Sequence, residues 1–141
     1  MESILEDLIN DKQDDATLRL PPPVFLDMGG EFVDYVKGES LTARFPNRHQ
    51  YENPFSYMQG GIIVALIDNT VSPLSYVVAP TSITREINTQ FKRPITREDE
   101  FVTVKAWVEE ITDSTISLKA EVRNSAGKLA TRATVKAIIL N

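Results

Sequence analysis

The chain has 141 residues, the length of one ordinary domain. Its 15 lysines and arginines against 20 aspartates and glutamates give a net charge of −5, which opposes binding to nucleic acid and to anionic lipid. The lack of cysteine excludes disulfides, thiolate metal sites and a cysteine nucleophile. With His49 as the only histidine, a zinc site of the usual histidine-rich kind is disfavoured.

Residues 1–30 differ in character from the rest of the chain. The first 15 lack the basic start and continuous apolar core of a signal peptide, and no charge-free apolar stretch in the chain reaches the length of a membrane span, so we expect a cytoplasmic protein without a membrane segment. Helical spacing predicts a short amphipathic helix, and the prolines and glycines of residues 14–30 predict an irregular connector. The apolar residues of this helix are Ile4, Leu5, Leu8 and Ile9. We therefore divide the chain into an N-terminal helix with a proline-rich connector (1–30) and a globular domain (31–141).

The globular domain opens with a predicted hairpin over residues 31–45. It consists of EFVDYV and LTARF, separated by KGES with its turn-forming glycine. Residues 46–58 are polar and aromatic with two prolines, which predicts a loop. Loops held by rigid elements often carry function, and Asn53 lies in this one.

Four later segments alternate apolar and polar residues with a period of two, the pattern of strands with one buried face. Charged or turn-forming segments separate them, so we expect a four-stranded antiparallel meander. Its apolar face needs a cover. The alternating apolar residues are Ile83, Ile87 and Phe91, then Val102, Val104, Ala106 and Val108, then Ile116, Leu118, Ala120 and Val122, then Ala133, Val135, Ala137 and Ile139.

Residues 60–78 are the candidate cover. Periodicity alone leaves GIIVALI open as a buried strand, but the length of the segment and the lack of glycine after Gly61 favour a helix buried on every side. We expect Pro73 to kink this helix or to end its regular part near residues 69–72. The predicted fold class is α+β, an antiparallel sheet wrapped around a central helix.

The spacing of several polar residues and glycines around this segment resembles hotdog-fold acyl-CoA thioesterases of the PaaI type. The resemblance covers about residues 30–140 and includes a strand that ends at a proline after a basic pair. The residues that carry it are Asn53, the run Gln59-Gly60-Gly61, Asp68, Thr84, and Lys92-Arg93-Pro94.

The resemblance implies a role for each matching position. The N–H of Gly60 would face the thioester carbonyl, where the positive end of a helix stabilises a developing oxyanion. Asp68 would be a general base on water or a nucleophile, Asn53 would position substrate or water, and Thr84 would orient the attacking water. Substrate contacts are expected from Gln59, Gly61, Tyr57, Lys92 and Arg93. For Lys92 and Arg93 the alternative to contact with the phosphates of CoA is a solvated strand end.

Helix geometry adds a constraint on how these residues meet. Gly61 and Asp68 are separated by about two helical turns, roughly 10 Å, so one chain cannot bring its own Asp68 to its own helix start. In the family the asparagine and glycine come from one subunit and the aspartate from another, which implies a homodimer or homotetramer with its site at the interface.

One position departs from the family pattern. Gln59 stands where PaaI-type proteins have histidine, so the chain keeps an amide that donates and accepts hydrogen bonds but loses the imidazole. His49 does not replace it. This replacement leaves the backbone amide of Gly60 unaffected. Its effect on the rate and on the range of substrates depends on the role that the histidine side chain has in the family.

Three functions follow from these residues. The first is hydrolysis of acyl-CoA, with CoA as part of the substrate and with no metal or other cofactor. The second is a 3-hydroxyacyl thioester dehydratase, which is disfavoured because those enzymes use a catalytic histidine that the helix region lacks. The third is a non-catalytic acyl-CoA or lipid-binding module in which Asp68 is only structural. The acyl group stays open, since aromatic and aliphatic chains both suit an apolar pocket.

Overall fold

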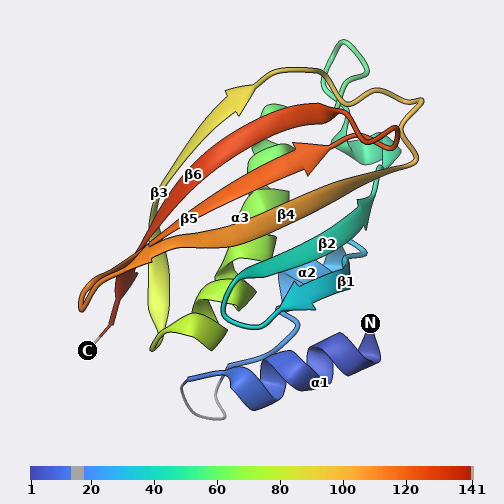
Figure 1. Cartoon of the computed structure of the whole chain (residues 1–141). Helices are drawn as coiled ribbons and strands as arrows, with labels where there is room; N and C mark the ends of the chain where they lie inside the picture. Colours follow the sequence, from blue (N-terminus) through green and yellow to red (C-terminus); the bar gives the residue numbers. More distant parts are fainter. Residues whose placement is uncertain (14–17, 141) are drawn as a thin grey trace.

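A computed structural model describes residues 1–13 and 18–140. Six strands form one antiparallel sheet in the order β1-β2-β4-β5-β6-β3, and Figure 1 shows this sheet curving around the long helix α3. This confirms the predicted architecture of a sheet wrapped around a helix. In chain order the elements are α1 (Glu2–Asp11), α2 (Pro23–Asp27), β1 (Glu31–Val36), β2 (Ser40–Pro46), a 3₁₀ turn (His49–Tyr51), α3 (Gly60–Val78), β3 (Ser82–Phe91), β4 (Phe101–Ile111), β5 (Thr115–Arg123) and β6 (Leu129–Ile139).

The order of the strands corrects the predicted meander. β4, β5 and β6 follow one another as expected, but β3 pairs with β6 at the far edge and β2 takes the place beside β4. Alternation reveals which face of a strand is buried and not which strand lies beside it. The connection over residues 92–100 is longer than a tight hairpin needs, and it carries the chain from the edge strand β3 past β6 and β5 to β4.

The inner face of the sheet follows the predicted alternation on three of the four later strands. The inward residues of β5 and β6, and Val102, Val104 and Ala106 of β4, are all buried against α3. On β3, by contrast, Ile83 and Phe91 are 55% and 54% exposed, so their predicted place on the buried face is wrong. β3 is an edge strand, and an irregularity between Thr84 and Glu86 shifts its register against β6.

Helix α3 runs without a break from Gly60 to Val78, which confirms the predicted helix and excludes the strand alternative. It continues past Pro73, so the expected end near residues 69–72 is wrong. Pro73 is buried, and burial of the helix in the sheet offsets the hydrogen bond that a proline cannot make. α3 is long and apolar enough to cross a membrane by length and composition, with a mean hydropathy of 1.5, but half of that stretch is buried inside the protein.

The N-terminal segments add to the same core. α1 forms as predicted and inserts Leu8, which is fully buried. Gln13, just after α1, donates from its backbone and from its side chain to the carbonyls of Tyr76 and Val77 in the last turn of α3, at 3.0 and 3.2 Å. These bonds fasten the N-terminal segment to the end of the central helix.

The predicted irregular connector contains a short helix. α2 begins at Pro23, because a proline suits the first helical position, where its missing N–H has no partner to lose. Its Phe25 is buried, stacks on Phe32 with ring centroids 4.3 Å apart, and meets Phe45 edge-on. The described part of residues 14–30 is therefore more ordered than its composition suggests.

Candidate active site

The start of α3 presents two backbone amides without partners. Gln59 is the N-cap residue with an extended backbone, and its carbonyl accepts from the amides of Ile62 and Ile63 at 3.0 and 3.2 Å. Within residues 1–13 and 18–140, the amides of Gly60 and Gly61 donate no hydrogen bond. A helix of this length places partial positive charge at these N–H groups, so they can bind an anion or an oxyanion.

A cavity of about 300 Å³ opens beside Gly60. It brings together five of the residues predicted from the sequence: Asn53, Tyr57, Gly60, Lys92 and Arg93. Its apolar wall is formed by Met58, Ile63, Phe91 and Pro94. A Cβ atom on Gly60 would lie 3.3 Å from Cζ of Phe91, so glycine leaves this approach to the amide open.

Asn53 shapes the loop that forms one side of the cavity. Its Oδ1 accepts from the backbone N–H of Phe55 at 2.9 Å and of Tyr57 at 3.1 Å, and its own N–H donates to the Tyr57 carbonyl at 2.7 Å. The oxygen is therefore committed to the turn, as expected of an Asn-Pro pair. In the described part of the chain its Nδ2 makes no hydrogen bond, which leaves one donor for a bound molecule.

Asp68 is held by two hydroxyl groups. Thr84, on β3, donates to Oδ1 at 2.8 Å, and Ser72, one turn further along α3, donates to the same oxygen at 3.3 Å. Among the described residues Oδ2 accepts no hydrogen bond. Two residues predicted separately for the site, Asp68 and Thr84, are thus in contact. Sequence reasoning missed Ser72, although its place four residues after Asp68 puts both on one helix face.

Asp68 and Gly60 do not meet within one chain. Asp68 does not line the cavity beside Gly60, and the separation of eight positions corresponds to about 12 Å of helix. The predicted residues therefore form two half-sites. One contains the cavity and the Gly60 amide, and the other contains Asp68 with its two hydroxyl groups.

Gln59 and Gly61 lie beside the cavity rather than in its wall. Both are exposed, and within the described residues the side chain of Gln59 makes no hydrogen bond. A Cβ atom on Gly61 would lie 3.3 Å from Oε1 of Gln59. This side chain can reach a molecule that enters the cavity, but it fixes no part of the fold.

The basic residues near the cavity differ in their availability. Arg97 binds Glu52 through two nitrogens at 2.8 and 2.9 Å, and this pairing lowers the pKa of Glu52 below its ordinary value. Within the described residues the guanidinium of Arg93 donates only to the Leu129 carbonyl, at 3.2 Å, and Lys92 forms no ion pair. Lys92 and Arg93 therefore remain able to bind an anionic ligand, whereas Arg97 is already paired.

No group of three histidine, cysteine, aspartate or glutamate side chains that could hold a metal ion occurs among the residues that the structure describes. The polar groups at the two half-sites are amides, hydroxyls, one carboxylate and two cations. This set suits stabilisation of an oxyanion, transfer of a proton and binding of phosphate.

The fold is shared with solved proteins, one of which is a thioesterase. The PaaI protein from the phenylacetic acid degradation operon of Escherichia coli superimposes with a TM-score of 0.79 at 17% identity, over 85% of this chain and 86% of that one. A thioesterase from Haemophilus influenzae gives 0.79 at 21% identity, over 92% and 94%. A Streptococcus mutans protein solved with acetyl-CoA gives 0.76 at 14% identity, over 92% and 98%. These likenesses define the hotdog fold.

The family follows from the sequence itself. Residues 55–131, more than half of the chain, match the model of the Thioesterase superfamily, and the chain belongs to that family. No curated protein matches the chain. The match begins in the loop at Phe55 and includes Gly60, Asp68 and Thr84, so both half-sites lie almost wholly within it. The chain is therefore a member of the thioesterase superfamily with the hotdog fold, as the resemblance implied.

Proposed function

We propose that the protein hydrolyses acyl-CoA thioesters. The observation that carries this proposal is the free Gly60 amide at the start of α3, which opens into a cavity flanked by Lys92 and Arg93. Family membership supports thioester hydrolysis in general. Two cations that are free to bind phosphate favour a CoA thioester, and a structural neighbour was solved with acetyl-CoA.

The chemistry requires three events. Water attacks the thioester carbonyl carbon while the carboxylate of Asp68 accepts a proton from that water. The Gly60 N–H donates to the negative charge that develops on the carbonyl oxygen. The carbon–sulfur bond then breaks, and the CoA sulfur leaves and takes up a proton. In the alternative route the carboxylate itself attacks the carbonyl carbon and forms an acyl anhydride, which water hydrolyses in a second step.

The active site proposed here is shared between two subunits. About 12 Å of helix separates Gly60 from Asp68, so the partner subunit's Asp68 would face the cavity beside Gly60. A twofold dimer forms two such sites, because each subunit gives a glycine amide to one site and a carboxylate to the other. The exposed edge of β3, which carries Thr84, is available for the contact that this arrangement needs.

Replacement of Asp68 by asparagine tests the reaction. Asp68→Asn keeps the shape of the side chain but removes the carboxylate, so turnover of a panel of acyl-CoA substrates, followed by thiol release, should fall by about 100-fold or more. Asp34→Asn is the matched control, because Asp34 is exposed on β1 and its side chain makes no hydrogen bond within the described residues. Equal turnover in the two variants would remove Asp68 from the mechanism.

The two routes differ in the origin of one oxygen atom. In a single turnover in ¹⁸O-labelled water, attack by water on the thioester places the label in the product acid and none on the protein. In the anhydride route, water that opens the anhydride at the Asp68 carbonyl leaves the label on that carboxylate and places an oxygen of the protein in the acid. Mass spectrometry of the acid and of the peptide containing Asp68 detects this exchange, and label on the peptide establishes the nucleophilic route.

Mixed dimers test the shared site. A Gly60→Pro variant and Asp68→Asn are each defective at both sites, but a heterodimer contains one intact site. Random mixing of equal amounts should restore about a quarter of the wild-type activity, since half of the dimers are then mixed. If mixing restores nothing, Gly60 and Asp68 of the same subunit act together or do not act at all.

A second candidate function is binding of acyl-CoA without hydrolysis. The observation that favours it is Gln59, whose exposed amide stands where the family carries a histidine. Tight binding of CoA by calorimetry, with no thiol released from any acyl-CoA in the panel, would identify a binding module. Release of thiol that depends on Asp68 identifies the hydrolase.

A further inference from the structure

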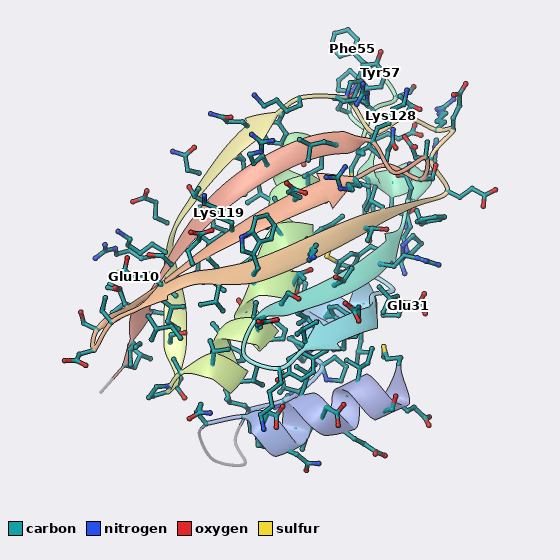
Figure 2. All side chains as sticks on the ribbon, viewed as in Figure 1. Glu31, Phe55, Tyr57, Glu110, Lys119 and Lys128 are labelled. Atoms are coloured by element: carbon teal, nitrogen blue, oxygen red, sulfur yellow. The ribbon has the colours of Figure 1, made fainter. Side chains whose placement is uncertain are left out.

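The loop before α3 exposes an aromatic ring to solvent. Phe55 is 77% exposed, more than any other large apolar side chain in the described residues, and Tyr57 beside it is 41% exposed. Figure 2 shows both at the tip of the loop, where they project beyond the sheet. Two aromatic rings held in water at the rim of a candidate site suggest a ligand that stacks on them.

This loop is fixed rather than free. Besides the bonds to the side chain of Asn53, the amide of Ser56 donates to the Asn53 carbonyl at 2.9 Å, and Glu52 and Met58 form an isolated β-bridge at the base of the loop. Ser56 has φ = 67°, a left-handed conformation that is costly for a residue with a side chain. A loop backbone that is held in place before binding loses little entropy when a ligand arrives.

A second cavity, of about 320 Å³, lies beside these rings. It shares Tyr57 with the cavity beside Gly60, so this side chain is a common wall of both. The only cation among the described residues that line it, Arg97, is already bound to Glu52, and Glu98 adds a negative charge that disfavours an anion. The second cavity therefore suits a flat, uncharged ring better than a phosphate. The residues that line it are Phe55, Ser56, Tyr57, Thr96, Arg97 and Glu98.

The two cavities match a ligand with three parts. A flat ring fits beside Phe55, anionic groups fit near Lys92 and Arg93, and a thioester fits beside Gly60. We infer that Phe55 and Tyr57 form the binding site for the adenine ring of CoA, and that this site makes the enzyme selective for CoA over shorter thioesters. This inference rests on the proposed function, since acyl-CoA is the substrate proposed above.

Other occupants fit the loop less well. An anionic lipid surface is disfavoured by the net charge of −5. Two rings alone would not hold a second copy of the chain, because stable interfaces bury about 1,200 Å² or more, and the dimer proposed above is expected to rest on the edge of β3. The adenine ring needs only the faces of one or two aromatic side chains.

The test compares ligands with and without the nucleotide. CoA and pantetheine are titrated by calorimetry against the wild-type protein, Phe55→Ala and Phe55→Trp. The alanine variant should bind CoA about tenfold more weakly, with its affinity for pantetheine unchanged, and the tryptophan variant should bind CoA as the wild type does. Val24→Ala is the control, because Val24 is 56% exposed on α2, which does not line either cavity.

Three results would overturn the inference. In the first, the wild-type protein fails to bind CoA, and in the second, Phe55→Ala binds CoA with the affinity of the wild type. In the third, Phe55→Ala loses affinity for CoA and for pantetheine by the same factor. A change of oligomeric state in Phe55→Ala, measured by light scattering, would instead assign the ring to a subunit contact. Wild-type protein that binds CoA but releases no thiol refutes the proposed function alone. If the wild-type protein hydrolyses acyl-CoA and Phe55→Ala binds CoA as tightly as the wild type, the adenine site alone is refuted.

Discussion

Gly60→Pro removes the proposed oxyanion donor with little disturbance of the fold. Gly60 is the first residue of α3, the helical position that proline tolerates best. Gln59 before it has φ −61° and ψ 139°, the extended conformation that a following proline requires. The amide that is lost donates to no other group in the described part of the chain, so no hydrogen bond of the fold is broken.

We expect Gly60→Pro to lose most of its kcat. Removal of one preorganised donor to an oxyanion lowers kcat by about 100- to 1000-fold, or roughly 3–4 kcal/mol of transition-state stabilisation. Gly60→Ala is the matched control, because it keeps the N–H and adds a Cβ that approaches Cζ of Phe91 at 3.3 Å. Phe91 is 54% exposed, so its ring can move by the few tenths of an ångström required. We expect Gly60→Ala to keep most of the wild-type kcat.

Steady-state thiol release measures kcat for both variants, and thermal unfolding verifies that both are folded. A Gly60→Pro protein that unfolds at the wild-type temperature and has the kcat of Gly60→Ala would refute the assignment of the Gly60 N–H. If kcat falls equally in the two variants, the added bulk at position 60 explains the loss, and the assignment of the Gly60 N–H is refuted as well.

Three further changes test the surroundings of the two half-sites. Thr84→Val keeps the shape of the side chain and removes the 2.8 Å bond to Asp68, so kcat should fall about tenfold in the thiol-release assay with the unfolding temperature nearly unchanged. Tyr35→Phe removes the 2.8 Å bond to Asp11, which is the main cause that lowers the pKa of that carboxyl. A carboxyl whose pKa is lowered in the folded state stabilises the fold above its ordinary pKa of 3.8, and this stability is lost as pH falls through the folded pKa. The variant should therefore be less stable than wild type by about 1 kcal/mol at pH 7 and equally stable in strong acid. Denaturant unfolding at each pH measures this difference. Leu8→Ala should lower the free energy of unfolding by about 2–5 kcal/mol, because Leu8 is fully buried; a loss below 1 kcal/mol would place α1 outside the cooperative core.

The sequence contained enough information for the fold and for most of the site. Alternation identified the strands, and length distinguished helix from strand for α3, because an apolar segment of 19 residues is too long for an ordinary strand. The spacing of Asn53, Gly60 and the basic pair predicted residues that do meet at one cavity. The family pattern also singled out Asp68 and Thr84, and the structure brings these two into contact.

The errors share a cause, namely that packing overrides local rules. Pro73 was expected to kink α3 or to end its regular part, but the helix continues because its surroundings are buried. Pro23 begins a helix inside an expected connector. The edge position of β3 depends on pairing between distant segments, which periodicity does not encode. Ser72 was missed because serine is common on helices, and its role is evident only from the hydrogen bond that it donates to Asp68.

The position of β2 beside β4 affects how the protein can be shortened. The family match spans residues 55–131, but the sheet also needs β1 and β2 before it and the remainder of β6 after it. A fragment cut at the limits of the match would expose the backbone of β4 along an unpaired edge and would leave β3 without most of its neighbour. Such open edges template aggregation, so expression of this fragment should give insoluble protein, even though it contains Gly60, Asp68 and Thr84.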